Sequence, residues 1–176
     1  MKSLHRATGR QLVWRARRLF SPIHDLLDAD GADVEPYATL TLQNPFVVSP
    51  GARCETADGI WGFRHRSFRR ESVIVHAEGS EVEAASFRRS WRRGTIRFPD
   101  GREFLWRPSS LLGPEWRIED SRQIPLLRFR RRFSLRTTYR LEIDPAAGSL
   151  VELPCLAGLG YYLLLLSRRR RAARPG

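Results

Sequence analysis

The stretch that decides the fold is Leu150-Val-Glu-Leu-Pro-Cys-Leu-Ala-Gly-Leu-Gly-Tyr-Tyr-Leu-Leu-Leu-Leu-Ser-Arg-Arg-Arg-Arg171. From Leu153 to Leu166 it contains no charged side chain, with a carboxylate just before it and four arginines just after. As an α-helix these 14 residues span about 21 Å, which is short of the roughly 30 Å hydrocarbon layer of a membrane. A helix that is apolar on every side must be surrounded by protein or by lipid. The rest of the chain therefore decides which of the two surrounds it.

From Tyr37 onward the apolar residues recur with the period of two that is typical of strands. The clearest hairpin joins Thr95–Phe98 to Glu103–Arg107 through a Pro-Asp-Gly turn, in which Gly101 can adopt positive φ without steric cost. The longest alternation covers residues 127–143, where odd positions are mostly apolar and even positions mostly arginine. These 17 residues exceed a normal strand, so we expect a turn or bulge near Arg131 or around residues 136–138.

Strands with a single apolar face and a helix that is apolar all round can satisfy each other. We predict a mainly β fold, in which a closed antiparallel barrel wraps around a central hydrophobic C-terminal α-helix at about residues 152–168. Glu152 and Pro154 suit the first turn of that helix, and the arginines that follow it suit its carbonyl end. Gly158 and Gly160 would let barrel side chains approach the helix closely.

The N-terminal region has a different pattern, in which apolar residues recur at helical spacing among arginines. These residues are Leu12, Ala16, Leu19, Phe20 and Ile23. They predict a basic amphipathic helix at about residues 9–27 within an N-terminal segment 1–27. The acidic, breaker-rich residues 28–36 then read as a linker, residues 37–171 as the barrel, and residues 172–176 as a tail.

Charge favours an anionic partner. The chain carries 31 basic and 19 acidic residues, a net charge of +12, and every basic residue except Lys2 is an arginine. An acidic spacer separates basic ends, which suggests phospholipid head groups or nucleic acid as partners. The alternative is a merely solvated basic surface that reflects a compositional bias toward arginine. Cys54 and Cys155 lie far apart in the sequence, so we expect no disulfide framework and a reducing compartment.

Enzymatic and metal-binding patterns are weak in this chain. No Walker, nucleophile-elbow or paired-cysteine metal motif occurs, and the Gly158-Leu-Gly160 sequence lacks the preceding parallel strand of a nucleotide site. His65 and His76 could meet across strands, but ordinary surface histidines explain them better. We therefore expect no enzyme activity, no cofactor and no metal.

The layout of short strands, the Asp100-Gly101 hairpin followed by Phe104-Leu-Trp-Arg107, and the apolar segment Glu152–Leu166 together resemble the tubby C-terminal-like superfamily. That superfamily includes LURP-one-related proteins and phospholipid scramblases. The resemblance covers about residues 37–171 and implies a closed barrel around a hydrophobic helix, with membrane and phosphoinositide association. No phosphoinositide-binding motif of tubby can be matched here, and the proline-rich region, cysteine cluster and calcium loop of scramblases are missing.

From these observations we expect a non-enzymatic, cytoplasmic module that binds an anionic phospholipid surface, peripheral to the inner membrane surface. The expected binding residues are Arg15, Arg17, Arg18, Arg168, Arg169, Arg170 and Arg171. Each arginine near such a surface contributes about 1 kcal/mol. Two alternatives stay open: a nucleic-acid-binding or regulatory scaffold protein, and a protein anchored in the membrane by residues 150–167.

Overall fold

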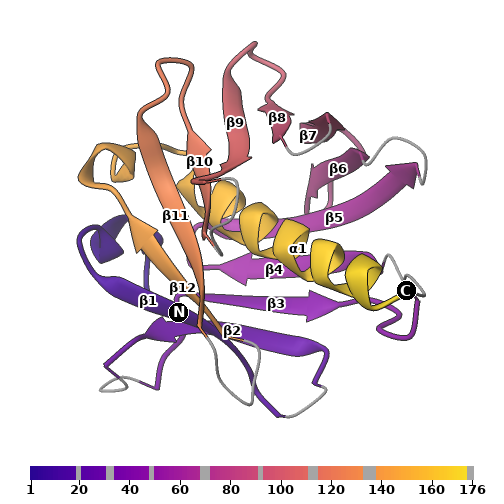
Figure 1. Ribbon diagram of the computed structural model, residues 1–176, viewed down its shortest axis with the longest axis horizontal. Coiled ribbons are helices and arrows are strands. Elements are labelled where there is room, and N and C mark those ends of the chain that lie inside the picture. Colours follow the sequence, from indigo (N-terminus) through magenta and orange to yellow (C-terminus); the bar gives the residue numbers. More distant parts are fainter. Residues whose placement is uncertain are drawn as a thin grey trace.

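The computed structural model describes residues 1–18, 21–30, 34–47, 50–67, 72–90, 93–110, 115–132 and 138–173, with the side chain of residue 67 left out. Twelve strands and one long helix make up the fold, with two short 3-10 helices, η1 (Leu4–Ala7) and η2 (Pro145–Ala147) (Figure 1). The strands are β1 (Gln11–Ala16), β2 (Ile23–Asp28), β3 (Ala38–Leu42), β4 (Ala52–Thr56), β5 (Gly59–Ser67), β6 (Ser72–Ala77), β7 (Glu83–Ser90), β8 (Arg93–Arg97), β9 (Glu103–Pro108), β10 (Glu115–Glu119), β11 (Pro125–Arg132) and β12 (Thr138–Ile143).

The strands form one closed barrel in which each strand pairs antiparallel with the next along the chain. Pairing of β1 with β12 closes the ring, with Leu12 opposite Leu141 and Trp14 opposite Tyr139. Closure removes the exposed sheet edges that would otherwise pair with other chains. The predicted closed antiparallel barrel is therefore confirmed.

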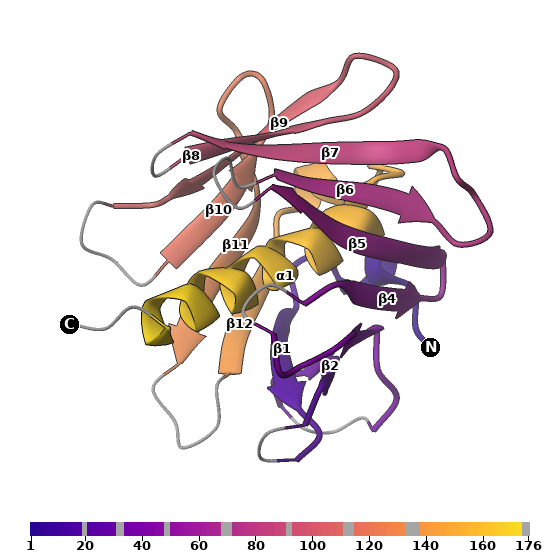
Figure 2. The ribbon, with the colours of Figure 1, turned by 90° about the vertical axis from the view of Figure 1, so that its right-hand side faces the viewer.

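The helix α1 (Leu153–Ala172) runs lengthwise through the barrel, and its C-terminal end emerges from one end of it (Figure 2). Every residue from Leu153 to Leu166 is buried, as a helix without a polar face requires. The predicted central helix is confirmed, and it continues through the arginines to Ala172. Among the described helices, none combines the length and the apolar character needed to cross a membrane.

Two glycines allow α1 to approach the strands closely. A Cβ atom on Gly158 would lie 2.6 Å from Cys54 Sγ, and one on Gly160 would lie 2.5 Å from Phe129 Cζ. Both distances are shorter than van der Waals contact, so even an alanine methyl group would displace these neighbours. The close approach expected from Gly158 and Gly160 is present.

The two predicted strand pairs also appear. Residues of β8 and β9 form the hairpin, and Gly101 adopts φ of +87° at its turn. In β11 and β12 the apolar positions face the interior, since Leu127, Phe129 and Leu141 are fully buried whereas the arginines between them are exposed or half-buried. These two strands pair antiparallel, so the chain reverses between them as expected; residues 133–137, which include the expected position near 136–138, lie outside the described residues.

The predicted N-terminal helix is wrong, because residues 11–16 and 23–28 form β1 and β2. Pro22 lies inside the expected helix, where its ring would clash with the preceding turn and remove a hydrogen bond. Trp14 and Ala16 alternate with Arg15 and Arg17, which is also the pattern of a strand with one inward face. Consequently residues 1–27 are no separate segment, and the barrel begins at β1 rather than at residue 37. The expected linker 28–36 is the connection from β2 to β3, of which residues 31–33 lie outside the described residues.

Candidate functional site: an arginine-rich end of the barrel

One end of the barrel, where α1 leaves it, holds 13 of the 25 arginines that lie within the described residues. We call this end the exit rim. It is formed by the last residues of β1, β3, β5, β7, β9 and β11 and the first residues of the strands that follow each of them, because successive connections of an up-and-down barrel alternate between its two ends. Described arginines at the exit rim are Arg15, Arg17, Arg18, Arg66, Arg88, Arg89, Arg93, Arg131, Arg132, Arg168, Arg169, Arg170 and Arg171.

Carboxylates are scarce at the exit rim. Among the described residues they are Asp25 in β2 and Glu115 in β10. Arg17 Nε donates to Asp25 at 2.7 Å, and the hydroxyl of Thr39 donates to the same carboxylate at 2.7 Å. Glu115 accepts a 2.6 Å hydrogen bond from the hydroxyl of Ser109. The positive charge of this end therefore has little opposite charge within the described protein.

The opposite end of the barrel carries ten of the 17 acidic residues of the described chain. Its turns and connections include Asp28, Asp30, Glu35, Asp58, Glu78, Glu81, Asp100, Asp120, Asp144 and Glu152. Several of these acids pair with local bases: Lys2 lies 3.7 Å from Asp28, and Arg102 pairs with both Asp100 and Glu152. Charge is thus separated along the barrel axis, with a basic exit rim and a mixed, largely acidic opposite end.

The four arginines at the end of α1 form two pairs, one that contacts the barrel and one that is exposed. Arg169 Nη1 donates to the backbone carbonyls of Pro45 at 2.5 Å and Val47 at 3.2 Å, and Arg170 Nη2 lies 2.6 Å from His65 Nε2. These contacts hold the helix end against the connection after β3 and against strand β5. Arg168 and Arg171 are exposed. Their cationic side chains also complement the negative carbonyl end of the helix dipole.

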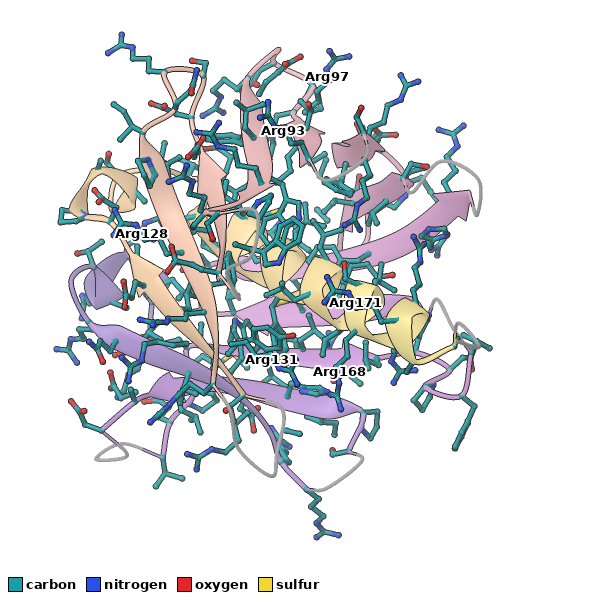
Figure 3. The ribbon with its side chains drawn as sticks, viewed as in Figure 1. Arg93, Arg97, Arg128, Arg131, Arg168 and Arg171 are labelled. Atoms are coloured by element: carbon teal, nitrogen blue, oxygen red, sulfur yellow. The ribbon has the colours of Figure 1, made fainter. Side chains whose placement is uncertain are left out.

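Arg168 and Arg171 form a cluster with Arg131 of β11 beside the ring of Tyr139. Burial raises the pKa of the Tyr139 hydroxyl, and the charges of Arg131, Arg168 and Arg171 oppose that rise, which places all three near it. Figure 3 shows Arg171 over the C-terminal half of α1 and Arg131 and Arg168 below it, all away from Arg128 and Arg97. The positive charges of these three arginines repel one another, and a bound anion relieves that repulsion.

The predicted N-terminal arginines lie at the same end. Arg15 and Arg18 are exposed, whereas Arg17 is held by Asp25. Ala16, between them, is opposite His24 in the β1–β2 register. The pKa of His24 is lowered to about 4, first by burial and then by the positive charge of Arg169, with a smaller contribution from Arg168. The two predicted arginine groups, more than a hundred residues apart in the sequence, therefore share one rim.

Sequence reasoning missed the contribution of the other strands to this rim. Arg66 in β5, Arg88 in β7, and Arg93 in β8 are exposed there, as is Arg132 at the end of β11. The sequence signal for them is the position of each arginine at a strand end, which can be used only when every strand is known. The predicted alternation itself was sound, because it directs the arginines outward and the aromatic residues beside them inward.

The other possible site in the sequence, a pair of histidines, is not formed. His76 lies opposite Gly62 in the β5–β6 register and His65 lies opposite Val73, so the two histidines are not paired. Among the described residues no group of three or more His, Cys, Asp or Glu side chains could hold a metal ion.

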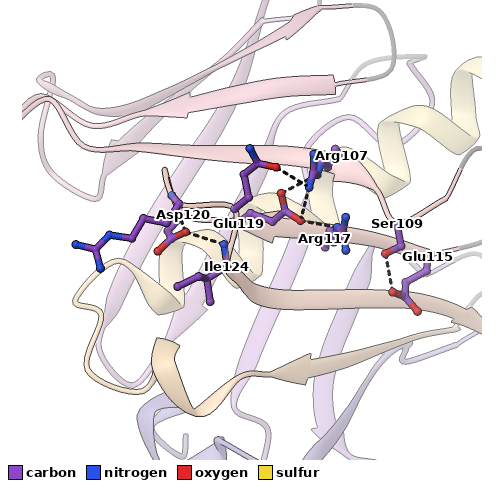
Figure 4. A network of polar contacts seen from close by, with 9 residues as sticks. Arg107, Ser109, Glu115, Arg117, Glu119, Asp120 and Ile124 are labelled. Atoms are coloured by element: carbon purple, nitrogen blue, oxygen red, sulfur yellow. Dashed lines mark hydrogen bonds and ion pairs between the residues drawn. The ribbon is translucent and has the colours of Figure 1, made fainter.

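A second charged cluster lies on the outside of β9 and β10 (Figure 4). Glu119 is fully buried there, with Arg107 Nε and Arg117 Nε each 2.6 Å from its carboxylate. Arg107 Nη2 also reaches Gln123 Oε1 at 3.4 Å. Because the carboxylate is enclosed by its own arginines, this cluster ties two strands together and presents no open site.

Comparison with protein-family models, with curated proteins and with solved structures gives no match to this chain. The geometry of the exit rim is therefore the observation that bears on function.

Proposed function

We propose that the protein is a non-enzymatic module that binds an anionic phospholipid surface through the exit rim. The observation that carries this proposal is the separation of charge along the barrel axis, which turns one end toward a negative surface and the other end away from it. The resemblance to tubby-like proteins and a cytoplasmic location, peripheral to the inner membrane surface, belong to the same proposal.

The shape of the rim supports a surface rather than a small ligand. Its arginines come from β1, β5, β7, β8 and β11 and from α1, so they surround the barrel opening instead of converging on one pocket. Each basic residue that reaches an anionic surface contributes about 1 kcal/mol, and many weak contacts add up to measurable binding. Such binding must weaken as salt screens the charges.

The two alternatives receive less support. Single-strand binders stack bases on exposed aromatic rings beside a cationic track. Here Phe63, Phe87 and Phe129, which alternate with arginines in the sequence, are at most 1% exposed and fill the barrel interior. Anchoring by residues 150–167 would need an apolar helix surface open to lipid, whereas the barrel covers α1 from Leu153 to Leu166.

Vesicle co-sedimentation tests the proposal. We expect binding to vesicles that contain phosphatidylserine, little binding to vesicles of phosphatidylcholine alone, and loss of binding in high salt. A triple variant Arg131→Gln, Arg168→Gln, Arg171→Gln removes the clustered rim charges, and at about 1 kcal/mol each its affinity should fall about 100-fold.

A matched control removes the same charge elsewhere. Arg6, Arg122 and Arg128 are exposed and lie outside the exit rim. The triple variant Arg6→Gln, Arg122→Gln, Arg128→Gln should keep most of the binding. Equal losses in the two triple variants would show that net charge alone attracts the protein, and an absence of binding at low salt would refute the proposal outright.

A further inference from the structure

A large apolar side chain stands fully in solvent at the exit rim. Phe46, in the connection from β3 to β4, is 98% exposed, and its neighbour Val47 is 48% exposed. A phenylalanine left in water forgoes the free energy that its burial would give, and apolar surface rimmed by charged residues is typical of protein–protein or membrane contacts. We call residues 45–47 the apolar tip.

Hydrogen bonds from α1 hold the apolar tip in place. The carbonyls on both sides of Phe46, those of Pro45 and Val47, accept hydrogen bonds from Arg169 of α1. A backbone hydrogen bond from Val47 N to Asn44 O at 3.2 Å closes a turn around Phe46. With its flanking carbonyls directed at the helix, the turn presents the Phe46 ring outward without further ordering, which lowers the entropic cost of binding.

The base of the connection is fixed as well. Gln43 N donates to Gly51 O at 2.8 Å, and the buried hydroxyl of Tyr162 donates to Pro50 O at 2.6 Å. Contacts at both ends of the β3–β4 connection, together with those from the end of α1, therefore support the apolar tip. In Figure 1 the C-terminal end of α1 lies beside the connection that follows the β3 arrow.

The charges around the apolar tip indicate which kind of surface it contacts. The tip carries no charge, and its backbone accepts a hydrogen bond from Arg169, which follows the exposed Arg168 in the sequence. Exposed apolar residues also occur at the other end of the barrel, but there they stand beside carboxylates, as Val34 does beside Glu35 and Val82 between Glu81 and Glu83. An anionic bilayer repels that end, whereas at the exit rim the same bilayer offers phosphates to the arginines and a hydrocarbon boundary to Phe46.

We propose that the apolar tip inserts into an anionic bilayer, so that the barrel docks end-on with the C-terminal end of α1 toward the membrane. This inference rests on the proposed function and adds to it an orientation and an uncharged anchor. Burying one phenylalanine from water into the interface should strengthen binding about 10-fold or more. The salt dependence of binding should not change when the ring is removed, since the ring carries no charge.

A single labelled cysteine tests the orientation. Cys54 and Cys155 are buried, so a new exposed thiol can be labelled selectively with the environment-sensitive fluorophore NBD. We compare Phe46→Cys with Val82→Cys, the latter at a 73% exposed position on the opposite end. On phosphatidylserine-containing vesicles the label at position 46 should brighten, shift to the blue and be quenched by doxyl-labelled lipid, whereas the label at position 82 should stay in water.

Affinity provides the second measurement. Phe46→Ser should weaken binding to the same vesicles about 10-fold, with an unchanged salt slope and an unchanged Tm, because the ring makes no contact that the fold requires. Val82→Ser is the matched control and should bind like the unmodified protein.

The possible results separate the inference from the proposed function. If vesicle binding persists while the label at position 46 stays in water, or while Phe46→Ser binds normally, the insertion is refuted and charge-driven docking stands. If nothing binds the vesicles at low salt, both proposals fail. If the protein does not bind the vesicles at all but binds a single-stranded oligonucleotide with a response of the label at position 46, the tip contacts nucleic acid and both lipid proposals fail.

Discussion

Replacing Gly160 by alanine tests the central claim that α1 is clamped inside the barrel. The added Cβ would lie 2.5 Å from Phe129 Cζ, 2.7 Å from Phe129 Cε2 and 3.3 Å from Ile118 Cδ1. Phe129 is fully buried, and its ring packs edge-on against Trp106 with ring centroids 5.6 Å apart, so it has little room to move. Overpacking of this kind costs about 1–3 kcal/mol, and contacts with two ring atoms and a third side chain favour the upper value.

Helix propensity opposes this cost. Alanine is about 1 kcal/mol better than glycine in a helix interior, so a Gly160→Ala variant without a clash would be more stable than the unmodified protein. With the clash, we expect a net loss of about 2 kcal/mol. Urea unfolding followed by circular dichroism measures it as a lower midpoint at an unchanged slope.

Two further variants make the result specific. A Cβ on Gly62, on the outside of β5, meets nothing within 4 Å, so Gly62→Ala should be neutral or more stable by up to about 1 kcal/mol. Phe129→Leu removes the ring that the new methyl group meets, so Gly160→Ala should cost at least about 1 kcal/mol less in that background. If Gly160→Ala alone stabilises the protein, the helix does not approach the strands as closely as described, and the reasoning is refuted.

Three other expectations follow from the buried helix and its surroundings. A chain ended after Ser149 loses the interior of its barrel and should be insoluble and without native circular dichroism; a soluble, folded product would contradict the clamped helix. Burial lowers the pKa of His24 from 6.5 to about 4. As the pH falls, the unfolded chain therefore binds a proton at this histidine before the folded protein does. Stability should therefore fall as the pH drops from about 6.5 to about 4, by up to about 3 kcal/mol, and His24→Gln, which can still pair with the Tyr161 hydroxyl, should flatten the pH profile of urea unfolding in that range. Burial raises the pKa of both thiols, that of Cys54 to about 12, so neither should react with a thiol reagent at pH 8 until denaturant is added; rapid reaction in native buffer would show that the core opens.

The central helix and the barrel around it could be predicted because each solves the other's burial problem. Residues 153–166 have no polar side that can face water, and the alternation in residues 127–143 leaves an apolar face that needs a cover. These two requirements are properties of the sequence alone. They are met only if the strands surround the helix, which is the arrangement found.

The N-terminal strands could not be predicted in the same way, because two periods fit the same residues. Leu12, Ala16 and Ile23 recur at helical spacing, while Leu12, Trp14 and Ala16 recur at strand spacing. What decides between the two is the pairing of β1 with β12, which joins residues about 130 positions apart and has no local signature. Pro22 was the one local signal against a helix.

That error also hid the binding surface. With residues 9–27 as a helix before a linker, Arg15 and Arg18 would lie on a separate segment, unrelated in space to Arg168 and Arg171 at the far end of the chain. As a strand, β1 must run either with or against β12, and antiparallel pairing sets Arg15 opposite Thr138, where β12 begins. The end of the barrel at which β12 begins is also the end at which α1 leaves, since β12 crosses the barrel once and α1 crosses back inside it. The N-terminal and C-terminal arginines thus lie at the same end of the barrel because an even number of antiparallel strands closes the ring. A prediction with the wrong number of strands cannot tell at which end of the barrel each connection lies.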